Sequence, residues 1–319
     1  MTRNTFNILV GLTLILGLTA CKQNKPKNSR TDTYSSGAIE FVSDESFSPI
    51  INEEMDVFHN IYVDAKVTPK YTNEFEAMNM LMNEKTCLAI VTRKYTEAEF
   101  QNLKDRKFLP YILPLAYDGL AFIVHNSNPD TLITVNEIKK ILTGEATKWK
   151  DIYPTSKLGD FDVVFDNPKS STVHYCVDSI LGGTPINSPH ITAVNKSAEV
   201  IDYVSNHENA IGVIGSNWLN DKRDTTNVTF KKNIRVMSVS RMDIATKYNS
   251  WKPYQYYLYN GSYPLIRTIY ALLNDPINGL PWGFAQFIAS ARGQLIIHKS
   301  GLLPAYGNFT VRTVNISGE

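Results

Sequence analysis

The sequence has few cysteines, almost no net charge and no internal repeat, and each absence narrows the class of protein. Three cysteines in 319 residues allow at most one disulfide. A formal net charge of +1 gives no indication of a nucleic-acid partner. No period of roughly 20 to 50 residues recurs, which argues against solenoids and propellers.

Familiar catalytic and metal-binding patterns are missing as well. The run "VIGSNW" is not Gly-x-Ser-x-Gly, no Ser-x-x-Lys accompanies a Lys-Thr-Gly, and His-Glu-x-x-His is absent. His174 and Cys176, two residues apart, do not share a helix face and are a weak metal site. We therefore predict no enzyme, no metal and no cofactor, with a Ser, His and Asp hydrolase as the catalytic alternative.

The first residues have the features of an export signal. Arg3 precedes the apolar run "ILVGLTLILGL", which is too short to span a bilayer comfortably. Leu18 to Cys21 then resembles the bacterial lipobox, which implies cleavage before Cys21 and acylation of its side chain. We predict a signal peptide at 1–20 and a polar, flexible tether at 21–36. The mature chain is then anchored to a bacterial membrane on its extracytoplasmic or periplasmic side.

Removing residues 1–20 leaves 31 basic and 31 acidic residues, so the mature chain is close to neutral. Only Cys87 and Cys176 then remain for a disulfide. Both lie in apolar patterns, so one disulfide and two buried thiols are both open, and the patterns favour thiols.

After the tether, strand-like and helix-like segments alternate, which predicts an α/β fold. Capping boxes at Thr96 to Glu99 and Thr134 to Glu137 mark two helix starts, and Gly144 marks a helix end. The strand-like runs are "AIEFVS", "YVDAKVTP", "CLAIVT", "LAFIVH", "DVVF", "IGVIGS" and "IRVMSV".

Polar residues crowd several turns where such a strand feeds a helix. In "DNPKSSTVHYCVDSILGG", Lys169, Ser170, Ser171 and Thr172 precede or begin a helical apolar pattern. A single hydroxyl there would be a helix cap, whereas several hydroxyls and a lysine suit an oxyanion. Three further turns repeat the theme, at Ser43, Ser46 and Ser48, at Thr72 and Asn73, and at Thr92 and Arg93.

At the level of whole segments the chain resembles phosphate-binding proteins of ABC transporters (PstS-like). The similarity lies in Asp118 to Ile152, in "NAIGVIG", in "YPLIRTIYALL" and in Phe284 to Ala305, in the order of that family. It implies a two-lobed type II periplasmic-binding-protein fold, with two mixed sheets flanked by helices and a hinge of two crossover strands. The lobes are expected at 37–119 with 241–319, and at 120–240.

The resemblance also implies a function and a site. A monomeric, membrane-anchored solute-binding protein would hold inorganic phosphate between its lobes and deliver it to ABC permease subunits. The implied ligand-binding residues are Ser46, Phe47 through its N–H, Thr72, Asn73, Thr92, Arg93, Lys169, Ser170, Ser171 and Thr172.

Some positions depart from the family pattern. Asp166 stands where the family has an arginine, and Lys169, His174 or Arg93 are the candidate replacements for its charge. A carboxylate that accepts the proton of phosphate would reject sulfate, and Glu45, Glu74 and Asp118 are candidates for it. The alternative is a drifted binding module for another oxyanion, or a sensor without a transport role.

Overall fold

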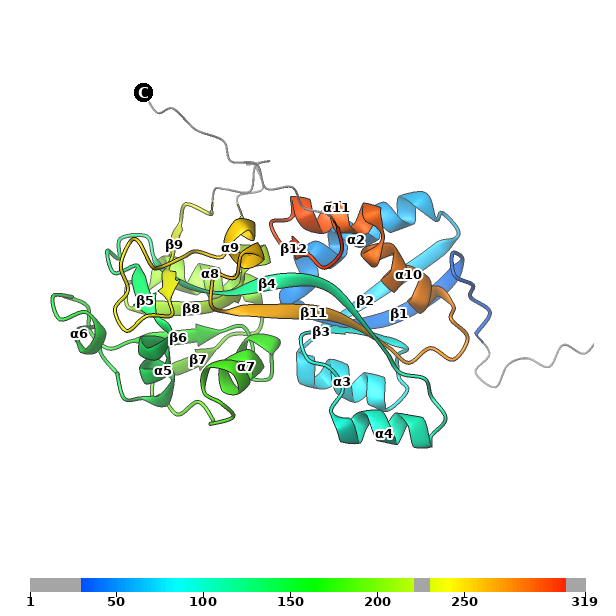
Figure 1. Cartoon of the computed structure of the whole chain (residues 1–319), viewed down its shortest axis with the longest axis horizontal. Helices are drawn as coiled ribbons and strands as arrows, with labels where there is room; N and C mark the ends of the chain where they lie inside the picture. The colour runs from blue at the N-terminus through cyan, green and yellow to red at the C-terminus, as the bar shows by residue number, and fades with distance from the viewer. Residues whose placement is uncertain (1–29, 221–229, 308–319) are drawn as a thin grey trace, which may run out of the picture. The chain divides into compact units, whose positions relative to one another are not determined.

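Strands and helices alternate along the chain, as the sequence predicts (Figure 1). The structure is a computed structural model that describes residues 30–220 and 230–307. The predicted signal peptide, the predicted lipid acceptor Cys21 and most of the predicted tether lie outside these residues. No helix in the described ranges is both long enough and apolar enough to cross a membrane.

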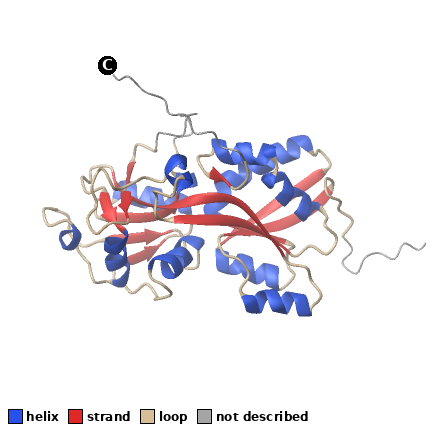
Figure 2. Cartoon of the chain, viewed as in Figure 1, coloured by secondary structure: helices blue, strands red, loops and turns tan. Residues whose placement is uncertain are grey.

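Ten of the described strands form one continuous mixed sheet with β4, Tyr111–His125, near its middle, and β5 and β10 pair in a separate two-stranded sheet (Figure 2). The strand order is β2 (Ala65–Thr72), β1 (Gly37–Asp44), β3 (Leu88–Val91), β11 (Ile266–Leu273), β4, β8 (Ala210–Gly215), β6 (Asp162–Phe165) and β7 (Ile191–Ala193). The small strands are β5 (Leu132–Thr134), β9 (Ile234–Val236), β10 (Ser238–Ser240) and β12 (Leu303–Pro304). We call β2, β1, β3 and β11 the first half, and β8, β6 and β7 the second half.

Two long strands, β4 and β11, run through the middle of the fold (Figure 1). Residues 111–119 of β4 pair with β11, and residues 120–124 of β4 pair with β8, in both cases antiparallel. The outer pairs, β1 with β2 and β3 and β6 with β7 and β8, are parallel. This mixed α/β arrangement confirms the predicted fold class.

Helices cover both faces of each half. Figure 1 shows α2, α10 and α11 on one face of the first half and α3 and α4 on the other. These helices are α2 (Ser48–Ile61), α3 (Glu74–Met82), α4 (Glu97–Asp105), α10 (Leu280–Ala289) and α11 (Ala291–Lys299). In the second half they are α5 (Val135–Thr143), α6 (Trp149–Ile152), α7 (Ser171–Tyr175), α8 (Ser197–Asn206) and α9 (Gln255–Tyr259). Both predicted capping boxes form, and Gly144 ends α5 with a φ of 81°.

Aromatic side chains build the core of each half. Phe284 packs between Phe41 and Phe58, with ring centroids 5.2 and 5.1 Å away. In the second half Trp149 packs on Phe161 at 5.1 Å.

Cys87 and Cys176 are thiols rather than a disulfide, as the apolar patterns favoured. The lobe boundaries remain a prediction.

One buried carboxyl in α2 makes stability depend on pH. Glu54 is 0% exposed, and neither of its oxygens has a hydrogen-bond partner among the described residues. Burial, with a smaller contribution from Glu53, raises the pKa of Glu54 from 4.5 to about 9. The folded protein keeps this proton while the unfolded chain releases it, so the free energy of unfolding falls as pH rises between these values.

We expect Glu54→Gln to stabilise the protein at neutral pH. At pH 7 release of the Glu54 proton favours the unfolded chain by about 3 kcal/mol, and glutamine has no proton to release. Urea unfolding at pH 5.5 and pH 8 measures the effect, with the exposed neighbour variant Glu53→Gln as control. An unchanged difference between the two pH values in Glu54→Gln would contradict the prediction.

Candidate functional site

The two halves meet at the polar turns that follow β1 and β6, both of which were predicted from the sequence to bind a ligand. A cavity of about 190 Å³ lies there. Its lining residues are Asp44, Glu45, Tyr71, Thr72, Asn73, Asp166, Asn167, Ser170, Asn195 and Lys196. Three of these are carboxylates and one is an amine, so acidic groups dominate the wall. No cluster suited to a metal ion occurs in the described part of the chain.

Asp44, the last residue of β1, connects the two halves. Its Oδ1 accepts hydrogen bonds from the backbone N–H and the hydroxyl of Ser46. Its Oδ2 accepts the backbone N–H of Ser171, the first residue of α7 in the second half, at 3.0 Å. The hydroxyls of Ser46 and Ser171 lie 3.1 Å apart. A carboxylate of the first half thus accepts a hydrogen bond from a backbone N–H of the second half.

Burial and negative neighbours change the acidity of Asp44. The side chain is 1% exposed. Burial first, and then the charges of Asp166 and Glu74, raise the pKa of Asp44 from 3.8 to about 7. Near neutral pH this carboxyl therefore exists in both protonation states, so it can accept a proton from a ligand or donate one.

Asp166 accepts hydrogen bonds from hydroxyl groups at the start of α7 and from Ser197. Its Oδ1 accepts the hydroxyl of Ser170 at 2.7 Å and the hydroxyl of Thr172. Its Oδ2 accepts the hydroxyl of Ser197 at 3.4 Å. Ser170 is the N-cap of α7 but makes no side-chain capping bond, so the simple capping explanation for its hydroxyl is wrong.

Glu74 forms a second bridge between the halves. Its Oε1 accepts the backbone N–H of Thr92 at 2.6 Å and the hydroxyl of Thr92 at 2.8 Å. Its Oε2 lies 2.7 Å from Nδ1 of His174 on α7. Burial acts to raise the pKa of Glu74, but the hydrogen bonds and charge of His174 and the Thr92 donors lower it overall. The same hydrogen bond raises the pKa of His174.

The buried cation of the site is Arg267 on β11. It pairs with Asp118 on β4 at 2.7 Å, and the two side chains are 1% and 0% exposed. Its Nη1 donates to the hydroxyl of Ser171 at 2.9 Å. A Cβ at Gly215 would come within 2.7 Å of Nη2 of Arg267 and 2.8 Å of Oδ2 of Asp118. Glycine at 215 therefore makes room for this ion pair.

The structure brings most of the predicted residues to this region. Ser46, Ser170, Ser171 and Thr172 form its centre, and Thr72 and Asn73 line its cavity. Phe47 packs beneath the guanidinium of Arg267, at 5.0 Å from its ring centroid.

Two predicted cations are engaged elsewhere. Both terminal nitrogens of Arg93 bind Glu99 at 2.7 Å. The amine of Lys169 lies 4.8 Å from the ring centroid of Phe75. Arg93 still lines a neighbouring cavity of about 260 Å³ together with Thr92, His174 and Arg267.

Three members of the site were not among the residues predicted from the sequence, namely Asp44, Arg267 and Ser197. Asp44 stands in the turn "SDESFSP", and a carboxylate at a strand end was a usable signal. Arg267 stands in "YPLIRTIYALL", where a single charge interrupts an apolar strand pattern and predicts a buried partner.

The hydroxyls on Asp166 are expected to stabilise the unliganded protein. Thr172→Val keeps the side-chain shape and removes the hydrogen bond to a buried carboxylate, which costs about 1.5 to 3 kcal/mol. Chemical denaturation without phosphate measures this loss. Thr143→Val, at a hydroxyl that binds the Lys139 carbonyl of its own helix, is the control. Equal stability of Thr172→Val and the native chain would contradict the role of Asp166 as acceptor.

A family model, curated relatives and solved structures resemble this chain. The protein-family model described as "PBP superfamily domain" matches residues 28–292. The phosphate-binding protein PstS of Borreliella burgdorferi is 27% identical over 267 residues, covering 80% of this chain and 86% of that protein. PstS of Pseudomonas aeruginosa is 22% identical and covers 84% and 83%. An ABC-type phosphate transport receptor from Vibrio cholerae superposes with a TM-score of 0.63 at 20% identity, covering 84% of this chain and all of the receptor.

Proposed function

Because this chain belongs to the PBP superfamily, we propose that it is an extracytoplasmic solute-binding protein that holds inorganic phosphate between the two halves of its sheet. It delivers the ligand to an ABC permease and is held at the membrane through Cys21. Relatives named as phosphate-binding proteins, which match more than three quarters of this chain, support the ligand class.

The convergence at Ser171 is the observation that carries this proposal. The backbone N–H of Ser171, the hydroxyl of Ser46 and the guanidinium of Arg267 meet around one point, together with the carboxyl of Asp44. Hydrogen-bond donors with a buried cation suit a small oxyanion. A carboxylate among them suits an oxyanion that still carries a proton.

Binding then takes the form of an exchange. A phosphate oxygen replaces the Asp44 carboxylate at the Ser171 N–H, and the freed carboxylate accepts the hydrogen of the ligand. Sulfate carries no proton near neutral pH, so the same carboxylate would repel it. Arg267 remains paired with Asp118 and supplies positive charge without leaving its place.

Asp166 supports a second candidate function. It accepts the hydroxyls of Ser170 and Thr172, which the family resemblance assigns to the ligand. A site whose donors are satisfied within the protein holds phosphate weakly or suits another ligand. The alternative is therefore a drifted binding module, or a sensor with no transport role.

Isothermal titration calorimetry of the anion-free protein with phosphate and with sulfate tests the proposal. Micromolar phosphate binding, about 8 kcal/mol, with no response to sulfate is the expected result. If neither anion binds, the proposal of phosphate transport fails and the drifted module is favoured.

A further inference from the structure

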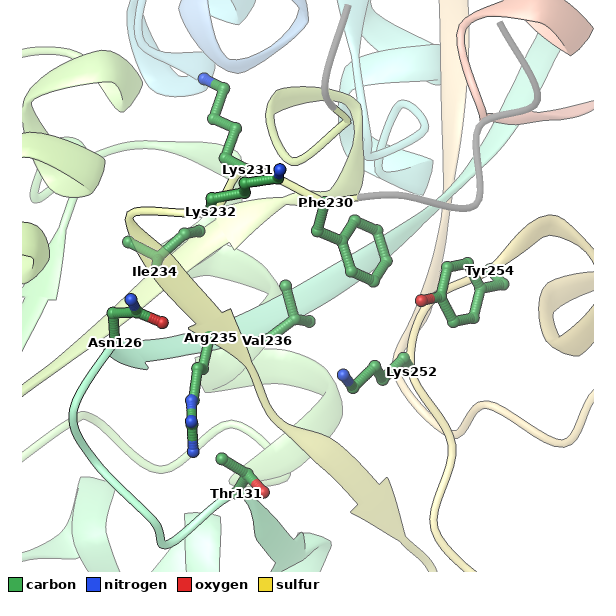
Figure 3. Close-up of a pocket in the computed structure, with 10 residues that line it drawn as sticks. All are labelled: Asn126, Thr131, Phe230, Lys231, Lys232, Ile234, Arg235, Val236, Lys252 and Tyr254. Carbon is green, nitrogen blue, oxygen red and sulfur yellow. The ribbon is translucent and has the colours of Figure 1, made fainter. Parts of the chain in front are cut away.

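A second and larger cavity lies beside β9 and shares no lining residue with the site between the halves (Figure 3). Its volume is about 600 Å³, which is within the range of small-molecule sites. The lining residues are Asn126, Thr131, Phe230, Lys231, Lys232, Ile234, Arg235, Val236, Lys252 and Tyr254.

The charge of this cavity is entirely positive among its lining residues. Lys231, Lys232, Arg235 and Lys252 line it, and the ten lining residues include no aspartate or glutamate. Arg235 donates one hydrogen bond to the Asn128 carbonyl at 3.1 Å, which fixes the guanidinium without neutralising it. Burial first, and then the charge of Arg235, lower the pKa of Lys252. Two cations therefore face the same space without a compensating carboxylate among those ten residues.

Aromatic and apolar side chains also line the cavity. The rings of Phe230 and Tyr254 stack with centroids 4.7 Å apart and an interplanar angle of 12°. Ile234 and Val236 of β9 are buried and also line the cavity. Figure 3 shows Lys252 between this aromatic pair and Arg235, with its amine directed away from Tyr254. A ligand here meets positive charge and a ring surface at once.

From this arrangement we infer a second ligand site, which binds an organic phosphate whose ester group is aromatic or apolar. A phosphomonoester carries close to two negative charges at neutral pH, which matches two cations in a lining without aspartate or glutamate better than a single carboxylate ligand does. The planar guanidinium of Arg235 suits a phosphate group, and Lys252 adds a point charge. The apolar body of the ligand packs on Phe230 and Tyr254. A soluble phosphate ester and a phospholipid headgroup both have this chemistry.

Titration of the purified full-length chain with phenyl phosphate tests the inference. The variant Arg235→Gln/Lys252→Gln is expected to bind at least tenfold more weakly than the native protein. Lys139→Gln/Lys140→Gln, which removes two exposed charges from α5, is the matched control and should bind normally. Asp44→Asn should also bind phenyl phosphate normally, because Asp44 belongs to the site between the halves.

The outcomes separate this inference from the proposed function. Native affinity in Arg235→Gln/Lys252→Gln, or no binding of phenyl phosphate at all, overturns the inference and leaves phosphate binding between the halves untouched. Loss in Asp44→Asn alone would place phenyl phosphate between the halves and also overturn it. Titration with dihexanoyl phosphatidic acid then distinguishes the sources, since binding tighter than that of phenyl phosphate favours a lipid headgroup.

Discussion

Replacing Arg267 with methionine is expected to lower the free energy of unfolding by about 3 to 5 kcal/mol, because Asp118 then stays buried as an unpaired charge. The loss includes the hydrogen bond from Arg267 to the Ser171 hydroxyl. Urea unfolding of the unliganded protein measures the change. Arg292→Met, at an exposed position of α11, is the control and should change stability by no more than about 0.5 kcal/mol.

A second substitution separates charge from packing. Asp118 accepts hydrogen bonds from the backbone N–H and the hydroxyl of Ser216 at 2.9 and 2.7 Å. Asp118→Asn keeps an oxygen that can accept these bonds and removes the charge. The double variant Arg267→Met/Asp118→Asn should therefore regain most of the stability that Arg267→Met loses. If the double variant is as unstable as the single one, the ion pair is not the reason for the loss.

Local patterns predicted the elements well because their causes are local. The capping boxes at Thr96 and Thr134 and the left-handed Gly144 depend on residues within one helical turn, and all three form. The pairing of Arg93 with Glu99, six residues away, was also accessible from the sequence. The resemblance assigns Arg93 to the ligand, and this assignment stays a prediction.

The partners of the site depend on contacts between distant segments, which local patterns do not contain. Asp44 and the Ser171 N–H are 127 residues apart, and Arg267 and Asp118 are 149 apart. The turns were found because strand ends and hydroxyls are visible in the sequence. The sequence does not show which carboxylate accepts which hydroxyl. Asp166 was therefore considered only as a missing arginine and not as the acceptor of the Ser170 and Thr172 hydroxyls.

Asp44→Asn should remove the discrimination between phosphate and sulfate. Asparagine has no negative charge to repel sulfate or to strengthen the hydrogen bond from protonated phosphate, and its amide N–H can donate to either anion. We expect phosphate affinity to fall and sulfate affinity to rise, so that the ratio of the two dissociation constants narrows by about 100-fold, or about 2.8 kcal/mol. Calorimetric titrations of both anions measure this ratio.

Two further measurements make this prediction specific to Asp44. Glu45→Gln is the matched control, because Glu45 lines the same cavity but binds Ser197 rather than Ser46 or Ser171. It should keep the native ratio. Because the folded pKa of Asp44 is raised to about 7, its proton stabilises the fold at low pH and this contribution is lost as pH rises through 7. Asp44→Asn should therefore be more stable than the native protein at pH 8. An unchanged anion ratio with this gain in stability would show that Asp44 is a buried acid but not the proton acceptor.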